Sequence, residues 1–128
     1  MKIIIETIPH EQQVYPTVGD YRYDEEGTLH IKVSSLNDEY METMIAIHEL
    51  IEERLIKKRG LPISVIDEFD IKYEIEREQG LHSREDEPGF DVNSPYLDEH
   101  TFATSIEMAI CSKMGYSWVE YSNKVNSL

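Results

Sequence analysis

The stretch from Asn37 to Gly60 restricts the fold more than any other part of the chain, because it predicts one long helix. Its apolar residues recur at helical spacing, and Asn37 or Asp38 can cap its first turn. Three basic residues close the stretch and suit the negative end of the helix dipole, and Gly60 is a typical helix stop. Any fold for this chain must accommodate that helix.

The residues before this helix predict strands. Residues 1–8, MKIIIETI, are rich in β-branched side chains, and residues 15–33 predict a hairpin that turns at 24–27. In the second arm of the hairpin, Leu29, Ile31 and Val33 alternate with polar residues, so one face of this strand is expected in the core. We therefore expect an N-terminal β-hairpin or small antiparallel sheet.

Further helices are predicted after Gly60. One fades near Gly80, one spans about 96–114, and a short last helix carries Trp118 and Tyr121. Residues 80–95 form an acidic connection without periodicity, and a loop of this length is usually functional or disordered. We expect a single α+β domain, residues 1–128, with three to four helices after the strands.

The composition indicates a globular chain that avoids anionic partners. Its 26 Asp and Glu residues outnumber 12 Lys and Arg residues, giving a formal charge of −14 that disfavours nucleic acid and anionic lipid surfaces. No stretch approaches the ~20 apolar residues of a membrane span. The single cysteine, Cys111, excludes an internal disulfide and is typical of a reducing cytosol, so we expect a cytoplasmic protein.

The long helix carries a histidine and a glutamate in the middle of its apolar arc. At about 100° per residue, His48 and Glu52 fall inside this arc, Glu49 lies on its boundary, and Glu42 and Glu53 lie on the solvent side. A glutamate that points into a core is costly unless it is paired, protonated or bound to a cation, and a histidine one turn away can share that cation. The pair therefore predicts a metal site. The alternatives are a histidine bonded to a core carbonyl and a glutamate paired with an arginine.

The predicted helix at about 96–114 also carries a histidine and a glutamate beside its apolar residues. His100 and Glu107 lie along one edge of its apolar stripe, so either could supply a further ligand if the two helices face each other. Half-exposed positions near solvent are the alternative for both. Several other polar residues could orient ligands, complete the site or cover it, although ordinary solvated positions explain them as well: Asp70, Glu74, His82, Asp86, Glu87 and Asp91.

A strand hairpin followed by TMIAIHELIEERL, residues 43–55, resembles the core of zincin-type metallopeptidases, in which an edge strand precedes an H-E-x-x-H helix. The resemblance implies that His48 is the first ligand and that Glu49 is the general base that takes a proton from metal-bound water. It also implies a third ligand downstream, His100 or Glu107. Glu52 stands where zincins have their second histidine, and a carboxylate can also bind zinc. Further oxygen ligands would favour manganese, iron or magnesium.

The chain also resembles small uncharacterised phage and prophage proteins between about Tyr15 and Trp118. The shared motifs are YPTVGD, AIHELIE, EFDIKYE, EPG and a PY…H…A…E helix. Because that family has no assigned activity, this resemblance supports the grouping of the residues without implying a reaction.

We therefore expect a metal-dependent hydrolase of zincin-like type that attacks an amide or an ester. Zinc would be bound by His48, Glu52 and His100, with Glu107 as a fourth ligand or as a residue that orients a ligand, and Glu49 would be the base. One alternative is a dimetal phosphohydrolase acting on a small nucleotide, with Asp70 and Glu74 among its ligands. The other is a non-catalytic, metal-stabilised acidic protein that binds a host protein. The sequence leaves the substrate and the oligomeric state open.

Overall fold

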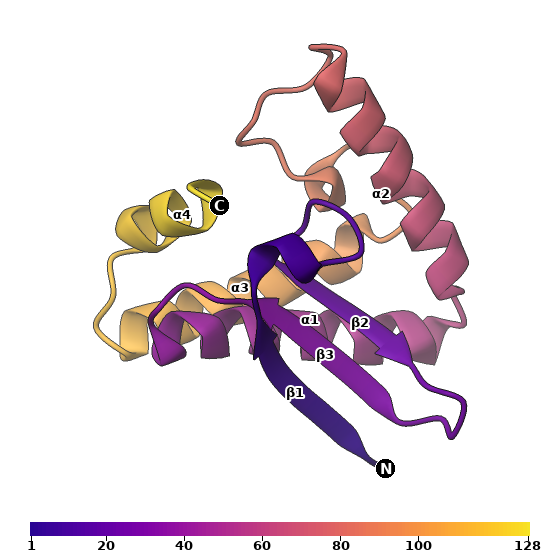
Figure 1. Ribbon diagram of the computed structural model, residues 1–128, viewed down its shortest axis with the longest axis horizontal. Helices are drawn as coiled ribbons and strands as arrows, with labels where there is room; N and C mark the ends of the chain where they lie inside the picture. Colours follow the sequence, from indigo (N-terminus) through magenta and orange to yellow (C-terminus); the bar gives the residue numbers. More distant parts are fainter.

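The computed structural model describes residues 1–128 as a small sheet followed by four α-helices (Figure 1). This confirms the predicted α+β class with N-terminal strands. The strands are β1 (Ile3–Ile8), β2 (Gly19–Tyr23) and β3 (Leu29–Ser34), and the helices are α1 (Glu39–Arg59), α2 (Ile63–Glu78), α3 (Leu97–Lys113) and α4 (Trp118–Asn126). Two short 3₁₀ turns, η1 (His10–Gln12) and η2 (Pro88–Phe90), lie in the connections.

The sheet is mixed, with strand order β1-β3-β2. Strands β2 and β3 form the predicted antiparallel hairpin, in which Tyr21 lies opposite Ile31. Strand β1 pairs with β3 in parallel, with Ile5 opposite Ile31, so the prediction of a small antiparallel sheet is correct only for the hairpin. The reason is topological: the hairpin inserts β3 between β1 and β2, and β3 runs in the same direction as β1.

Helix α1 begins and ends where the sequence predicts. The Asp38 side chain accepts hydrogen bonds from the backbone N–H groups of Tyr40 and Met41, and Gly60 ends the helix with a φ of 82°. The helix packs on the sheet, and the core between them contains Leu29, Ile31, Val33, Met44 and Ile45.

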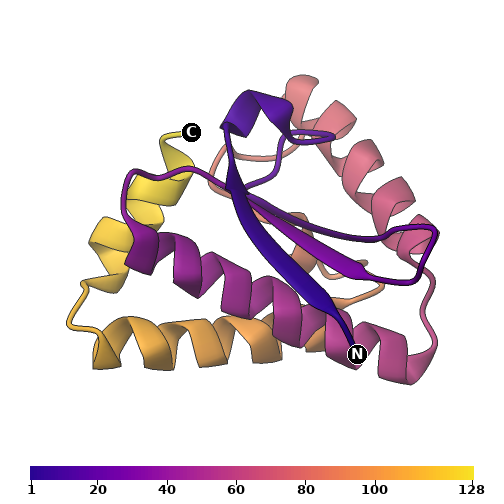
Figure 2. The same cartoon turned by 60° about the horizontal axis from the view of Figure 1, so that its bottom comes forward.

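Helix α3 lies antiparallel along α1 (Figure 2). Helix α4 follows through a short connection, and α2 stands away from this body, with Ile66, Asp70 and Tyr73 as its buried residues (Figure 1). None of the helices is both long enough and apolar enough to cross a membrane.

Glu53 corrects one prediction about α1. Its side chain is 1% exposed, although the helical wheel places it on the solvent side, whereas Leu55 is 37% exposed. The guanidinium of Arg54 donates two hydrogen bonds to the Glu53 carboxylate and one to the Tyr23 hydroxyl. Neutralised by Arg54, Glu53 can lie beneath the end of β2.

Candidate metal centre

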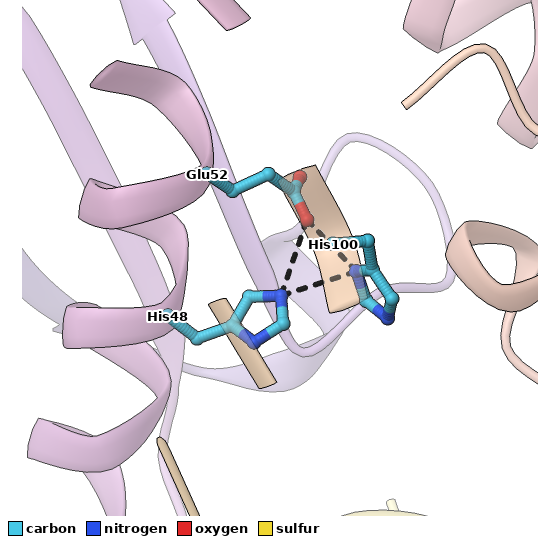
Figure 3. Close-up of side chains that lie close together, drawn as sticks. All are labelled: His48, Glu52 and His100. Carbon is cyan, nitrogen blue, oxygen red and sulfur yellow. Dashed lines mark hydrogen bonds and ion pairs between the residues drawn. The ribbon is translucent and has the colours of Figure 1, made fainter. Parts of the chain in front are cut away.

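Three side chains from α1 and α3 converge between the two helices (Figure 3). Oε2 of Glu52 lies 3.2 Å from Nε2 of His48 and 2.8 Å from Nδ1 of His100, and the two nitrogens are 3.2 Å apart. All three residues are buried. We call His48, Glu52 and His100 the His–Glu–His triangle. It forms because positions 48 and 52 share a face of α1 and the antiparallel packing brings the first turn of α3 opposite them.

Two residues of the triangle, His48 and Glu52, are also hydrogen-bonded to side chains of other elements. Nδ1 of His48 lies 2.9 Å from Oε1 of Glu107 on α3, and the Tyr121 hydroxyl on α4 donates to the other oxygen of Glu107 at 2.5 Å. On the other side, the Tyr21 hydroxyl on β2 donates to Oε1 of Glu52 at 3.0 Å. Such partners fix the orientation of metal ligands and the tautomer of a histidine ligand.

Residues 87–90 also pack against His100. Its Nε2 has no hydrogen-bond partner at normal distance, and Oε1 of Glu87 lies 3.5 Å away. Gly89 is so close that an added Cβ atom would lie 2.3 Å from Cγ of His100. The Phe90 ring meets the imidazole edge to face, with centroids 4.5 Å apart. The 87–90 segment therefore fixes the position of this ring.

The triangle lacks hydrogen-bond donors. Because the Glu107 carboxylate is only an acceptor, Nδ1 of His48 carries the proton, and Nε2 of a neutral ring presents a lone pair to the triangle. Glu52 contributes a second acceptor. His100 can supply one proton through Nδ1, but its Nε2 then turns a lone pair toward the Glu87 carboxylate. With neutral rings the three atoms share at most one proton, so the triangle is completed either by protonation of the histidines or by a bound cation.

The pKa directions show how the metal-free triangle gains donors. Burial lowers the pKa of His48, but its hydrogen bonds to Glu107 and Glu52 raise it well above the ordinary value. At His100, burial likewise lowers the pKa and the hydrogen bond to Glu52 raises it, and the net shift is upward. Burial raises the pKa of Glu52, yet hydrogen bonds from the two histidines bring it below its ordinary value. Without a metal, both imidazoles therefore favour the protonated form, in which each can donate to Glu52.

The triangle has suitable dimensions for a metal ion. Ligand distances of about 2.0–2.2 Å in a tetrahedral zinc site place donor atoms about 3.3–3.6 Å apart. The three separations of 2.8, 3.2 and 3.2 Å require the donor atoms to move outward by a few tenths of an ångström at each edge. The buried His–Glu–His group can therefore hold a divalent ion.

Glu49 lies beside the triangle and faces a cavity of about 650 Å³ that His48, Glu52 and His100 also line. No protein group hydrogen-bonds its half-buried carboxylate, and burial raises its pKa to about 8. The carboxylate lies against the backbone of β2 at Gly19, where an added Cβ would be 2.5 Å from Oε1 of Glu49. Any side chain at position 19 would displace Glu49.

A second buried polar cluster lies beneath α2. The Asp70 carboxylate accepts hydrogen bonds from the hydroxyls of Tyr15 at 3.1 Å and Tyr96 at 2.5 Å. Burial raises its pKa to about 7, although both hydrogen bonds act in the opposite direction. We call these three residues the Asp70 cluster. The solvated position considered for Asp70 is wrong, because the residue is 6% exposed.

The remaining acidic and histidine candidates are engaged away from the triangle. Glu74 pairs with Arg77, and His82 pairs with Glu76. Asp86 and Asp91 accept hydrogen bonds from backbone N–H groups in their own turns. Within loop 80–95, Glu87 is the predicted residue that approaches the triangle.

The groups that the sequence reasoning missed are tyrosine hydroxyls and two glycines. Tyr21 and Tyr121 orient Glu52 and Glu107, and Gly19 and Gly89 give room to Glu49 and His100. The glycines belong to the YPTVGD and EPG motifs, which were the available signal for them. No comparable pattern marks the tyrosines.

Comparison of the chain with protein-family models, with curated proteins and with solved structures gives no match. The likeness to zincins and to phage proteins therefore stays a prediction from sequence motifs, and the geometry of the site carries the functional argument.

Proposed function

We propose that this chain is a metal-dependent hydrolase in which His48, Glu52 and His100 bind one zinc ion and Glu49 is the general base. The observation that carries this proposal is the meeting of three convergent acceptors with a neighbouring carboxylate that has no protein partner and faces a cavity. Two histidines and one glutamate form a known catalytic zinc ligand set that leaves a fourth position for water or substrate. The ion would supply Lewis acidity, which lowers the pKa of water and polarises a carbonyl.

The part assigned to Glu49 follows from its surroundings. It adjoins His48 on α1, so the helix holds its carboxylate beside the triangle, and Gly19 leaves room for it on the β2 side. A zinc ion bound beside Glu49 would favour its ionised form, and the carboxylate could then accept the proton of an attacking water and return it to the leaving group of an amide or ester. Glu107, which orients His48, takes the role of a positioning residue.

The donor set favours zinc over manganese and magnesium, and iron is the alternative that the same donors suit. Two imidazole nitrogens and one carboxylate oxygen suit zinc, whereas manganese and magnesium prefer sites dominated by oxygen. A dimetal phosphohydrolase has less support, because Asp70 and Glu74 are bound to tyrosines and to Arg77 and offer no second ligand set. A purely structural metal has less support because the triangle borders a cavity.

Metal analysis and hydrolysis assays on matched variants test the proposal. Wild type and Glu49→Gln should each bind one equivalent of zinc, whereas His48→Ala and His100→Ala should lose it. Wild type should hydrolyse members of a peptide and ester library, and Glu49→Gln should be inactive while still holding zinc. Failure of wild type to bind zinc, manganese or iron would refute the metal centre. Equal hydrolysis by wild type and Glu49→Gln would refute the role of Glu49.

A further inference from the structure

The outer edge of β1 is an open edge of the sheet. Strand β1 packs closely only on β3, and no helix or strand lies along its other side (Figure 1). The carbonyls of Lys2 and Ile8 accept hydrogen bonds from the β3 side. In a parallel ladder the even-numbered residues of β1 therefore bond to β3, and Ile3, Ile5 and Thr7 direct their N–H and C=O groups outward.

This edge is also largely apolar and has few of the features that usually protect one. Ile4 is 37% exposed and Ile5 is 52% exposed. Ile5 shares with Ile3 the face of β1 that is turned toward α1, yet no side chain beyond the edge covers it. Natural sheets guard such edges with proline, bulges or charged side chains; residues 3–8 contain neither proline nor a bulge, and Glu6 is their one charged residue. The edge is therefore suited to pairing with another strand.

We propose that β1 pairs with β1 of a second copy of this chain, antiparallel, about a two-fold axis at Ile4. In this register Ile3 lies opposite Ile5 of the second copy, and their outward backbone groups exchange hydrogen bonds. Ile4 meets Ile4 at a position without hydrogen bonds, and Lys2 faces Glu6 on both sides of the axis. Each of these pairs is apolar or joins opposite charges, so the edge is complementary to itself.

The neighbouring registers fit less well. Centring the axis on Ile5 places Glu6 opposite Ile4 and Lys2 opposite Ile8, which removes both charge pairs. A shift by a single residue would place the outward backbone groups of one β1 strand opposite residues of the other β1 strand whose backbone groups are already bonded to β3. Pairing about Ile4 also uses up both β1 edges, so the assembly closes as a dimer.

The dimer is independent of the proposed metal chemistry. Strand β2, which carries Tyr21 to the triangle, lies at the opposite edge of the sheet from β1. Charge changes in β1 should therefore leave zinc binding unchanged, and a failure of either proposal would not affect the other.

Analytical ultracentrifugation of charge variants tests the pairing. Wild type should form dimers, and Lys2→Glu should raise the dimer Kd about tenfold because Glu6 then faces a like charge twice. The double variant Lys2→Glu/Glu6→Lys should restore the wild-type Kd. Lys72→Glu, an equal charge change on the exposed surface of α2, is the matched control. A monomer at every concentration, or a Kd that ignores Lys2→Glu, would overturn the proposal.

Cysteine cross-linking tests the register. Ile4→Cys places two thiols opposite each other at a close, non-hydrogen-bonded pair, so mild oxidation should link the two chains. Ile5→Cys offsets the thiols and should link poorly. The native Cys111 is buried and does not compete. Linking through Ile5→Cys in preference to Ile4→Cys would overturn the axis at Ile4.

Discussion

The His–Glu–His triangle and the Asp70 cluster both bury a carboxylate, but their hydrogen-bond inventories differ. Asp70 receives two tyrosine hydroxyl donors, one on each oxygen. In the triangle, one oxygen of Glu52 meets two imidazole nitrogens that bring at most one proton while both rings are neutral. The Asp70 cluster is complete with neutral donors, whereas the triangle needs either protonated imidazoles or a bound cation. A buried acid becomes a metal-site candidate through the donors it lacks, and burial alone does not identify one.

Removing a ligand should produce the largest difference between the two clusters. His100→Ala should weaken zinc binding roughly a thousandfold, because a zinc site of about 10–16 kcal/mol is shared among three or four ligands. Asp70→Asn should leave the zinc Kd within about twofold, because Asp70 has no contact with the triangle. Competition with a chromophoric chelator measures both constants. Loss of zinc from Asp70→Asn would show that the two clusters act as one site.

Truncating the acid of the Asp70 cluster should chiefly affect folding. Asp70→Ala leaves the half-buried hydroxyl of Tyr15 and the buried hydroxyl of Tyr96 without their acceptor, and an unpaired buried group costs about 1–3 kcal/mol. The free energy of unfolding should fall by about 2–4 kcal/mol in urea titrations of the metal-free protein. The triple variant Tyr15→Phe/Tyr96→Phe/Asp70→Ala removes the unpaired groups and should recover part of this loss. No loss in Asp70→Ala would contradict the account of this cluster.

The same cluster should make stability depend on pH. Two neutral donors satisfy the oxygens of Asp70 but do not cancel its charge, so burial raises its pKa to about 7. An unfolded Asp has a pKa near ~3.9, so between about pH 4 and pH 7 the folded protein binds more protons than the unfolded chain. Its free energy of unfolding should therefore fall as the pH rises through this window, by on the order of 2–4 kcal/mol. Urea titrations of metal-free protein should show this slope in wild type and a flatter one in Asp70→Asn.

The triangle should respond to the same change of pH in the opposite direction. Its ligands must release their extra proton to bind zinc, and the pKa of His48 is raised. Zinc affinity should therefore increase with pH, while the stability contributed by Asp70 decreases.

The sequence predicted the inward direction of His48 and Glu52 because helical periodicity fixes which residues of α1 share a face. Opposite α1, the structure places His100 at the triangle and Glu107 behind His48. The periodicity of α3 places both residues on one apolar edge. Choosing between them requires the register of the two packed helices, that is, how far one is shifted along its axis relative to the other. Side-chain spacing within one helix does not contain that register.

Glu53 shows a second limit of sequence reasoning. The wheel treats a helix face as either covered or exposed. Glu53 is nevertheless buried, and Arg54, which also contacts Tyr23 at the end of β2, pairs with its carboxylate. Tyr21 and Tyr121 reach the site from β2 and α4, so their role depends on contacts between distant segments. These contacts have no local pattern in the sequence.

Changing a group behind a ligand should have a smaller effect than removing the ligand. Glu107→Gln takes away the negative charge that holds the Nδ1 proton of His48 and should weaken zinc binding about 10–100-fold. Tyr121→Phe removes one donor to Glu107 but leaves the contact with His48, so its loss should be smaller. Chelator competition measures both, and Glu42→Gln, on the same helix as His48 but away from the triangle, is a control. A Tyr121→Phe loss larger than that of Glu107→Gln would contradict this order.

The smallest expected effect concerns the 87–90 segment, whose contact with His100 is steric. In Gly89→Ala the new methyl group would lie 2.3 Å from Cγ of His100, so either the imidazole or the loop must move. The other two ligands on α1 are untouched, and zinc affinity should fall by about tenfold or less. The visible spectrum of the cobalt-substituted protein should also change, because it reports the geometry of the ligands. Val92→Ala, at an 84% exposed position of the same loop, should change neither quantity. If Gly89→Ala kept both the affinity and the spectrum of wild type, the ring of His100 would be positioned by α3 alone, and the 87–90 segment would serve only to cover it.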